Sequence, residues 1–148
     1  MNKKSSETLD LRLFFPYRLS VLQQLVSKAI SQHYHDEFDL NRIEWRVMAT
    51  LAMFDSISAR DICEFTHVAK MQVSRAIARL KKSDLVIQKV SDADHRATQL
   101  SLTDEGWQIY RRIVPMVKTE EQEILAHLSA AEQGQLLKIL AKLERALD

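Results

Sequence analysis

Glycine and proline are unusually scarce in this chain, which contains two of each among its 148 residues. At average usage a chain of this length would hold about ten glycines and seven prolines. Sandwiches and barrels reverse direction every few residues, and their turns depend on these two residue types. The scarcity therefore predicts a mainly α-helical chain, and the length suffices for one domain with its own hydrophobic core.

Net charge and cysteine content exclude several protein classes. The 21 basic and 20 acidic residues nearly cancel, which excludes a uniformly basic, histone-like chain. A single cysteine cannot form an internal disulfide, which favours a reducing compartment. The longest uncharged run, Leu19 to Ser27, is too short to cross a membrane, and acidic residues follow the basic start where a secretory signal would be apolar. We expect a soluble, cytoplasmic protein without membrane contact.

Apolar spacing and capping patterns predict six helices. Apolar residues recur at helical spacing behind Pro16, a residue suited to the first turn of a helix. Capping patterns begin at Asn41, Ser58 and Ser129, and Thr103 can cap a long helix in which Pro115 is expected to cause a kink rather than a stop. The expected helices span about 16–34, 41–54, 58–65, 69–83, 103–128 and 129–147.

Two short runs between the fourth and fifth expected helices predict a β-hairpin. Leu85–Val90 and Ala97–Leu102 are rich in β-branched and aliphatic residues, and a largely polar connection separates them. A short helix, a longer helix and then a hairpin is the order found in a winged helix-turn-helix. We therefore expect a mainly α fold with a small β-wing. The outer helices carry apolar faces that can cover one another or, as we expect, pack against a second copy.

Charge is sorted along the sequence although its total is close to zero. Residues 68–96 contain seven Lys or Arg against three acids, whereas residues 119–148 contain six acids against three bases. A local excess of positive charge is what binding to nucleic-acid phosphates requires. The segment that holds the fourth helix and the hairpin is therefore the candidate nucleic-acid surface.

The fourth expected helix has one apolar face and one face suited to reading bases. At about 100° per residue, Val73, Ile77 and Leu80 point inward. On the opposite face Arg75 can contact a guanine edge, and Gln72 an adenine edge. The alternative interpretation is an ordinary solvated amphipathic helix. The residues that we predict to form the DNA-binding surface are Lys70, Met71, Gln72, Ser74, Arg75, Arg79, Lys82 and Lys89, with Asp94 and Arg96 on the hairpin. Arg96 could enter the minor groove, whereas Asp94 would hold a neighbouring arginine in place rather than contact DNA itself.

Several segments together resemble the MarR (multiple antibiotic resistance regulator) family of bacterial transcription factors. They are Val73–Leu80 in the fourth helix, then Leu85–Val86, then Asp94–Arg96, then Leu100–Gly106. The similarity extends over about residues 14–147. Its most specific part is aspartate-x-arginine in the hairpin followed by leucine-threonine-x-x-glycine.

This resemblance implies how the chain is organised and what it does. Residues 11–39 and 103–148 would be dimerisation helices, and residues 40–102 a winged helix-turn-helix that binds double-stranded DNA. The family pattern implies a homodimer on a palindromic operator, usually a repressor released by a small ligand. By carry-over, Ser74 and Arg75 lie on the reading helix, and Asp94 and Arg96 lie on the wing. A winged-helix module that binds proteins instead is the alternative, and a steep salt dependence of duplex binding would distinguish the two.

Two positions depart from the family pattern. Asp84 stands where a glycine usually follows the reading helix, and aspartate tolerates a left-handed backbone better than most residues. Ala69 stands where a capping side chain is common, which should weaken the first turn of that helix by about 1 kcal/mol unless Thr66 or DNA compensates.

A less specific similarity, over Phe14–Leu22 and Glu44–Val47, links the chain to a branch of the family associated with aromatic-acid catabolism. One cation among aromatic side chains suits a small aromatic carboxylate, because the ring can stack and the acid can pair. The alternative is that these aromatic residues form dimer core and that the arginine pairs within the protein. The predicted effector-binding residues are Phe14, Phe15, Tyr17, Arg18, Trp45 and Met48.

Other reactive side chains give little support for catalysis or metal binding. His33 and His35 lie on different sides of a helix, so a polar helix end is a better interpretation than a zinc site. Cys63 lies among apolar residues, which favours a buried cysteine over a redox sensor. No phosphate-binding loop, nucleophile elbow or carboxylate pair is readable, so we predict no enzyme activity, no metal and no cofactor.

Overall fold

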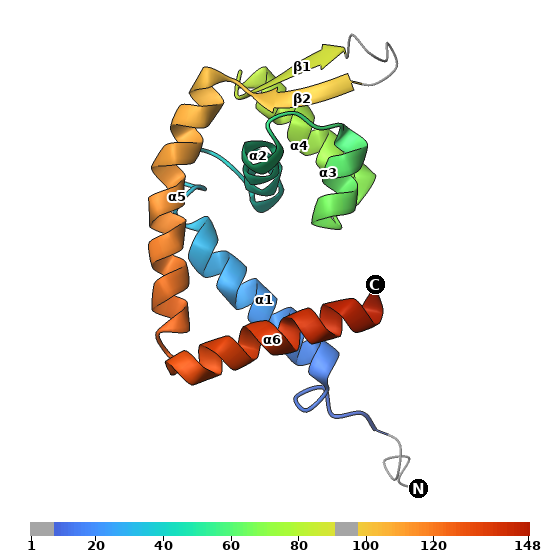
Figure 1. Ribbon diagram of the computed structural model, residues 1–148, viewed down its shortest axis with the longest axis vertical. Helices are drawn as coiled ribbons and strands as arrows, with labels where there is room; N and C mark the ends of the chain where they lie inside the picture. The colour runs from blue at the N-terminus through green and yellow to red at the C-terminus, as the bar shows by residue number, and fades with distance from the viewer. Residues whose placement is uncertain (1–7, 91–97) are drawn as a thin grey trace, which may run out of the picture.

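The computed structural model describes residues 8–90 and 98–148, and these form six helices and one two-stranded sheet. Figure 1 shows α2, α3, α4 and the hairpin gathered at one end of the molecule, with α5 leading away from them to α6. The predicted mainly α fold with a small β-wing is confirmed. In chain order the elements are α1 (Phe15–Ser31), α2 (Arg42–Phe54), α3 (Ala59–Thr66), α4 (Lys70–Lys82), β1 (Val86–Val90), β2 (Thr98–Leu102), α5 (Asp104–Leu125) and α6 (Ala130–Leu147).

The winged unit, which we define as α2 to β2, surrounds most of the hydrophobic core. The two strands pair antiparallel with Val86 opposite Leu102. Ile57, just before α3, exchanges two backbone hydrogen bonds with Leu100, which joins the α2–α3 connection to the edge of the wing. The buried core residues of this unit are Val47, Met48, Leu51, Ile62, Val73, Ala76, Ile77, Leu80, Val86, Leu100 and Leu102, together with Leu85.

Short-range caps determine where four helices begin. Asn41 and Ser129 form full capping boxes, in which side chain and backbone satisfy each other's N–H groups. The side chains of Ser58 and Thr103 each accept one backbone N–H of the following turn. All four caps were expected, because the information for a cap lies within four consecutive residues.

The two unusual positions around α4 behave as their chemistry predicts. Asp84 adopts a left-handed backbone with φ of 59°, so aspartate replaces glycine here without breaking the turn. Ala69 precedes α4 without a side-chain cap. The Thr66 hydroxyl donates instead to the carbonyl of Ile62 at 2.6 Å, so Thr66 does not compensate for the missing cap.

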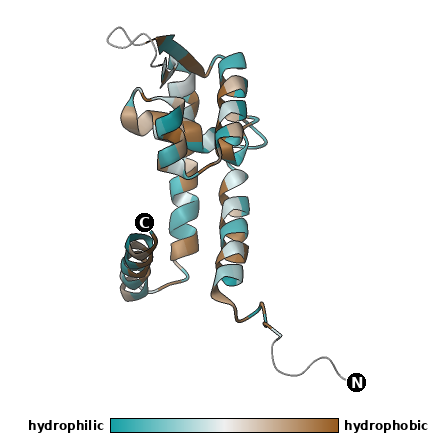
Figure 2. Cartoon of the chain, turned by 90° about the vertical axis from the view of Figure 1, so that its right-hand side faces the viewer, coloured by the Kyte–Doolittle hydropathy of each residue, from teal (hydrophilic) through white to brown (hydrophobic). Residues whose placement is uncertain are grey.

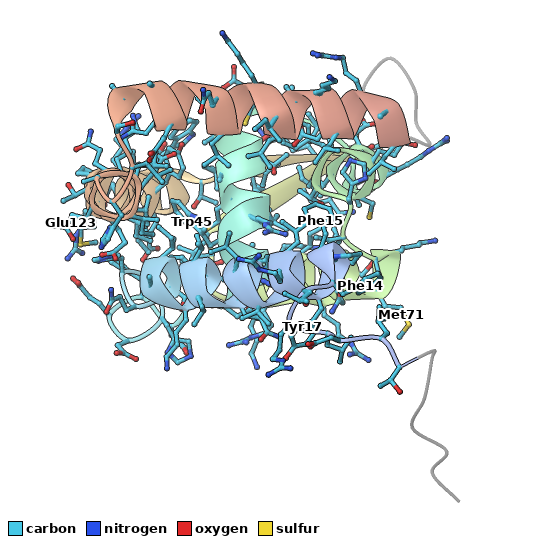
Figure 3. All side chains as sticks on the ribbon, turned by 90° about the horizontal axis from the view of Figure 1, so that it is seen from below. Phe14, Phe15, Tyr17, Trp45, Met71 and Glu123 are labelled. Carbon is cyan, nitrogen blue, oxygen red and sulfur yellow. The ribbon has the colours of Figure 1, made fainter. Side chains whose placement is uncertain are left out.

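The outer helices α1 and α6 contain no buried residue. Figure 3 shows them running along opposite sides of the molecule when it is seen from below, and Figure 2 shows α6 nearly end-on with a hydrophilic and a hydrophobic side. A single chain therefore leaves both apolar faces in water. The large exposed apolar residues on these two helices are Phe15, Tyr17, Leu19, Val21, Leu22, Leu25, Leu137, Ile139, Leu140, Leu143 and Leu147.

Two helix ends differ from the prediction. α1 ends at Ser31, and Tyr34 lies beyond it in a turn, fully buried. α5 continues through Pro115, as expected, but ends at Leu125 rather than near residue 128. None of the helices in the described residues is both long enough and apolar enough to span a membrane.

Candidate nucleic-acid interface

α4 turns its two faces as the sequence predicts. Val73 and Leu80 are 1% exposed and pack in the core, which fixes the rotation of the helix. Gln72 and Arg75 consequently face solvent. The other predicted contact residues on this surface, Lys70, Met71, Ser74, Arg79, Lys82 and, on β1, Lys89, are exposed as well.

The outward face of α4 combines small and long polar side chains. Ser74 and Ala78 leave the helix backbone accessible, while Arg75 and Lys82 project from the same side. Small residues allow a helix to approach the floor of a major groove, and a guanidinium can then reach base edges. The arrangement is chemically suited to inserting α4 into duplex DNA.

Arg79 differs from its neighbours because its charge is engaged within the protein. One guanidinium nitrogen lies 3.0 Å from Oε1 of Glu44, and the other lies 3.9 Å from Oδ2 of Asp39. Glu44 is 2% exposed, so this is an ion pair with a buried carboxylate. The helical phase predicts correctly that Arg79 is exposed, but it does not reveal the pairing.

A groove of about 690 Å³ lies between the start of α3, α4 and the sheet. Two basic residues that were not among the predicted contacts, Arg60 and Lys81, line it together with Ser74 of the reading face. Lys81 donates to Oε1 of Gln88 on β1, which places its ammonium group between helix and wing. The sequence signal for Arg60 is its position two residues after the Ser58 cap, in the first turn of a helix.

The tip of the hairpin lies outside the described residues. Asp94 and Arg96, the predicted wing residues, fall in the segment 91–97. Their contribution to DNA binding therefore stays a prediction.

A comparison with protein families shows what this interface resembles. Residues 38–97, which span the end of the α1–α2 connection, the helix-turn-helix and most of the hairpin, match the model of the MarR family. The match covers 60 of the 148 residues, and over this segment the chain is similar to MarR family proteins.

Proteins with sequences similar to this chain are named as transcriptional regulators. The regulator HosA of Escherichia coli O157:H7 is 27% identical over 122 residues, which cover 82% of this chain and 90% of HosA. The family and these relatives are regulators rather than enzymes, in agreement with the prediction of no catalytic activity.

Solved structures of MarR proteins share the fold. BpsR of Bordetella bronchiseptica, whose DNA binding is regulated by 6-hydroxynicotinic acid, is 22% identical with a TM-score of 0.83, over 93% of this chain and 98% of BpsR. A MarR family regulator of Streptomyces coelicolor, solved in complex with DNA, is 19% identical with a TM-score of 0.82, over 98% of this chain and 93% of the other. At these identities the likeness establishes the winged helix-turn-helix architecture.

The predicted effector residues are not brought together within one chain. Phe14, Phe15, Tyr17 and the exposed Arg18 lie at the start of α1, at the end far from the winged unit, whereas Trp45 lies near α5 (Figures 1 and 3). Met48 is fully enclosed in the core. Their role as an effector site stays a prediction, and no cavity among those described is lined by all six.

An aromatic stack joins the α1–α2 connection to α5. Trp45 lies between Tyr34 and Tyr110, with both ring centroids 5.5 Å away and both pairs nearly parallel. Burial raises the pKa of Tyr34 above its ordinary value, and the positive charges of Arg42 and Arg46 partly oppose this rise. Sequence spacing predicted Trp45 as a ligand wall, but its partners came from segments far apart in the chain.

The polar residues after α1 have structural partners. Nε2 of His33 lies 2.9 Å from Oε2 of Glu120, which ties the end of α1 to α5. Within residues 8–90 and 98–148, no three His, Cys, Asp or Glu side chains cluster in a way that could hold a metal ion. Cys63 is partly buried against the core, close to the expected position.

Proposed function

We propose that this chain is a homodimeric repressor that binds a palindromic DNA operator and leaves it when a small aromatic carboxylate binds. The observation that carries the DNA-binding part is the outward face of α4. Arg75 and Lys82 are exposed there while Val73 and Leu80 hold the helix in the core. A helix so oriented can enter a major groove with its reading residues directed at the bases.

The apolar outer helices support the homodimer. α1 and α6 each expose several large hydrophobic side chains, and exposed apolar surface of this extent is typical of an interaction site. A two-fold pair would present two copies of α4, which suits a palindrome whose half-sites lie one helical turn apart.

The experiment that tests DNA binding starts from a pool of random 30-bp duplexes, from which the purified protein selects a binding sequence. Arg75→Ala should weaken binding to the selected duplex by about tenfold or more, since a bidentate base contact contributes about 1–3 kcal/mol. Arg145→Ala, which removes the same charge from the exposed end of α6, is the matched control and should bind as the wild type does.

Two outcomes would contradict this assignment. Equal affinity of Arg75→Ala and wild type would exclude α4 as the reading helix. Duplex binding that hardly changes between low and physiological salt would exclude phosphate contacts and would favour the protein-binding alternative.

The effector proposal rests on the chemistry at the start of α1. Arg18 is exposed among Phe14, Phe15 and Tyr17, each of which is at least 40% exposed. These aromatic rings can stack on a ligand ring while the guanidinium pairs with its carboxylate. The regulation of BpsR by 6-hydroxynicotinic acid, an aromatic carboxylate, supports the same ligand class here.

The probes for this proposal are benzoate, 6-hydroxynicotinate and the uncharged benzamide. The acids should raise the melting temperature and release the selected duplex, whereas benzamide should do neither. Arg18→Ala should abolish both effects, and Lys28→Ala, an exposed cation further along α1, should retain them. Normal release from Arg18→Ala would remove that residue from the effector site.

A further inference from the structure

We infer that Arg79 is a positioning residue, which holds the reading helix α4 at its angle to α2 through Glu44 and does not itself contact DNA. This inference rests on the proposed function. Sequence reasoning had placed Arg79 among the DNA contacts because its side chain is basic and exposed.

Glu44 is the fixed point of this arrangement. Its carboxylate accepts the backbone N–H of Asn41 at 3.0 Å and the side-chain amide of Asn41 at 3.1 Å, and its own N–H donates to Asn41 at 2.8 Å. The carboxylate is therefore held by the N-terminal cap of α2 and is shielded from water. Two of the hydrogen bonds to this carboxylate therefore come from the cap of its own helix rather than from α4.

Arg79 supplies the opposite charge that this buried carboxylate requires. A buried charge without a partner is strongly unfavourable, so the guanidinium is drawn to the position 3.0 Å from Glu44. Asp39 lies on the far side of the guanidinium at 3.9 Å and adds a second negative charge. Two carboxylates against one cation leave no positive excess at this point for a phosphate.

The pair also lies where α4 meets the rest of the molecule. Arg79 and Glu44 line a small cavity of about 190 Å³, together with residues of the α1–α2 connection and of α5. Moving α4 relative to α2 would separate the two charges. The ion pair thus resists the rotation that would carry Arg75, one turn earlier on α4, away from the bases.

The test compares Glu44→Gln, Arg79→Gln and the double variant. Glutamine is compatible with the third position of a capping box, so Glu44→Gln keeps the start of α2 and removes only the charge. Each protein is titrated with the selected duplex and with a scrambled duplex, over a range of salt concentrations. Lys82→Gln, on the same helix, is the matched control, because Lys82 forms no ion pair with any residue in the described part of the chain.

The expected result is a loss of discrimination. Glu44→Gln and Arg79→Gln should each reduce the ratio of selected to scrambled affinity by about tenfold, and the double variant should lose no more than the worse single variant, as for partners in one interaction. Their salt slopes should equal that of the wild type. Lys82→Gln should instead weaken both duplexes alike and lower the slope by about one.

If Arg79 contacts DNA directly, the two single variants should give different results from those above. Glu44→Gln would then free the guanidinium and leave the affinity unchanged or higher, and Arg79→Gln would lower the salt slope; either result overturns the inference. If either result is found while the wild type still prefers the selected duplex to the scrambled one, the inference fails but the proposed function stands. A wild type that fails to select any duplex overturns the proposed function, and this inference with it.

Discussion

The winged unit and the outer helices differ in whether their apolar side chains are buried within the single chain. Each helix of the winged unit buries at least one side chain completely, and the strands add more to the same core. α1 and α6 bury none, although each has an apolar face. α5 joins the two regions and buries Gly106 and Ile113 close to the winged unit.

The difference indicates which contacts the single chain completes and which a second copy would complete in the proposed dimer. A core that closes within one chain gives a fixed scaffold for α4, independent of protein concentration. Apolar faces left in water gain stability only by association, so their contribution depends on concentration. In the proposed dimer, the orientation of α4 would rest on the first kind of contact and the spacing between the two copies of α4 on the second.

The largest effect is expected from a substitution at the centre of the core of the winged unit. Leu51 is fully buried in α2, and Leu51→Ala should lower the free energy of unfolding by about 3 kcal/mol, through lost burial and a residual cavity. Urea denaturation at several protein concentrations measures this loss, which should be the same at each. A loss that fades at high concentration would mean that the core itself is completed by a partner.

The two glycines test the same contrast, because Gly106 lies where α5 meets the winged unit and Gly134 lies on the outer helix α6. A Cβ at Gly106 would overlap the carbonyl oxygen of Leu85, so Gly106→Ala should destabilise the junction of α5 and the wing by about 2 kcal/mol. Nothing lies within 4 Å of a Cβ at Gly134 on α6. Gly134→Ala should therefore stabilise the protein by up to about 1 kcal/mol, through higher helix propensity.

Thermal unfolding of both variants beside the wild type provides the measurement. Equal and opposite outcomes from the two substitutions are not expected, because one forces a backbone to move and the other only restricts the unfolded chain. A destabilised Gly134→Ala would show that α6 is closely covered by another copy at that position.

A smaller effect is expected on the exposed face of α1. Leu22 is 57% exposed in the single chain, and Leu22→Ala should weaken dimerisation about tenfold, equivalent to about 1.4 kcal/mol. Sedimentation equilibrium measures the dimer dissociation constant, with Gln24→Ala as a polar control on the same helix. An unchanged constant would place the dimer contact elsewhere.

Local signals made much of the fold predictable. Caps at Asn41, Ser58, Thr103 and Ser129 depend on a few consecutive residues, and the rotation of α4 follows from the spacing of its apolar side chains. The exposed reading face was predicted from that rotation alone. Even the departure at Asp84 was predicted, because the left-handed backbone depends on residue type.

Long-range pairing was not predictable by the same means. α1 ends early because Tyr34 is buried against Trp45, and Trp45 stacks in turn on Tyr110 of α5. The charge of Arg79 is engaged by Glu44, which a helical phase cannot reveal. The proposed effector residues lie apart for a similar reason, since sequence proximity to an aromatic segment does not state which helices meet.

The aromatic stack of Tyr34, Trp45 and Tyr110 gives the smallest expected effect. Burial holds the pKa of Tyr34 above its ordinary value of about 10, so the unfolded chain loses this proton at a lower pH than the folded one. The contribution of Tyr34 to the free energy of unfolding is therefore fully present below about pH 10. It declines as the pH rises toward the pKa that Tyr34 has in the folded chain. Phenylalanine cannot ionise, so Tyr34→Phe should not show this loss. The free energy of unfolding of the variant should therefore rise relative to that of the wild type only in this alkaline range. Urea denaturation of both proteins from pH 7 to 11 measures this difference. If the two free energies of unfolding change in parallel over the whole range, the Tyr34 phenol is as well hydrated in the folded chain as in the unfolded one. The stack between α2 and α5 would then be open to water.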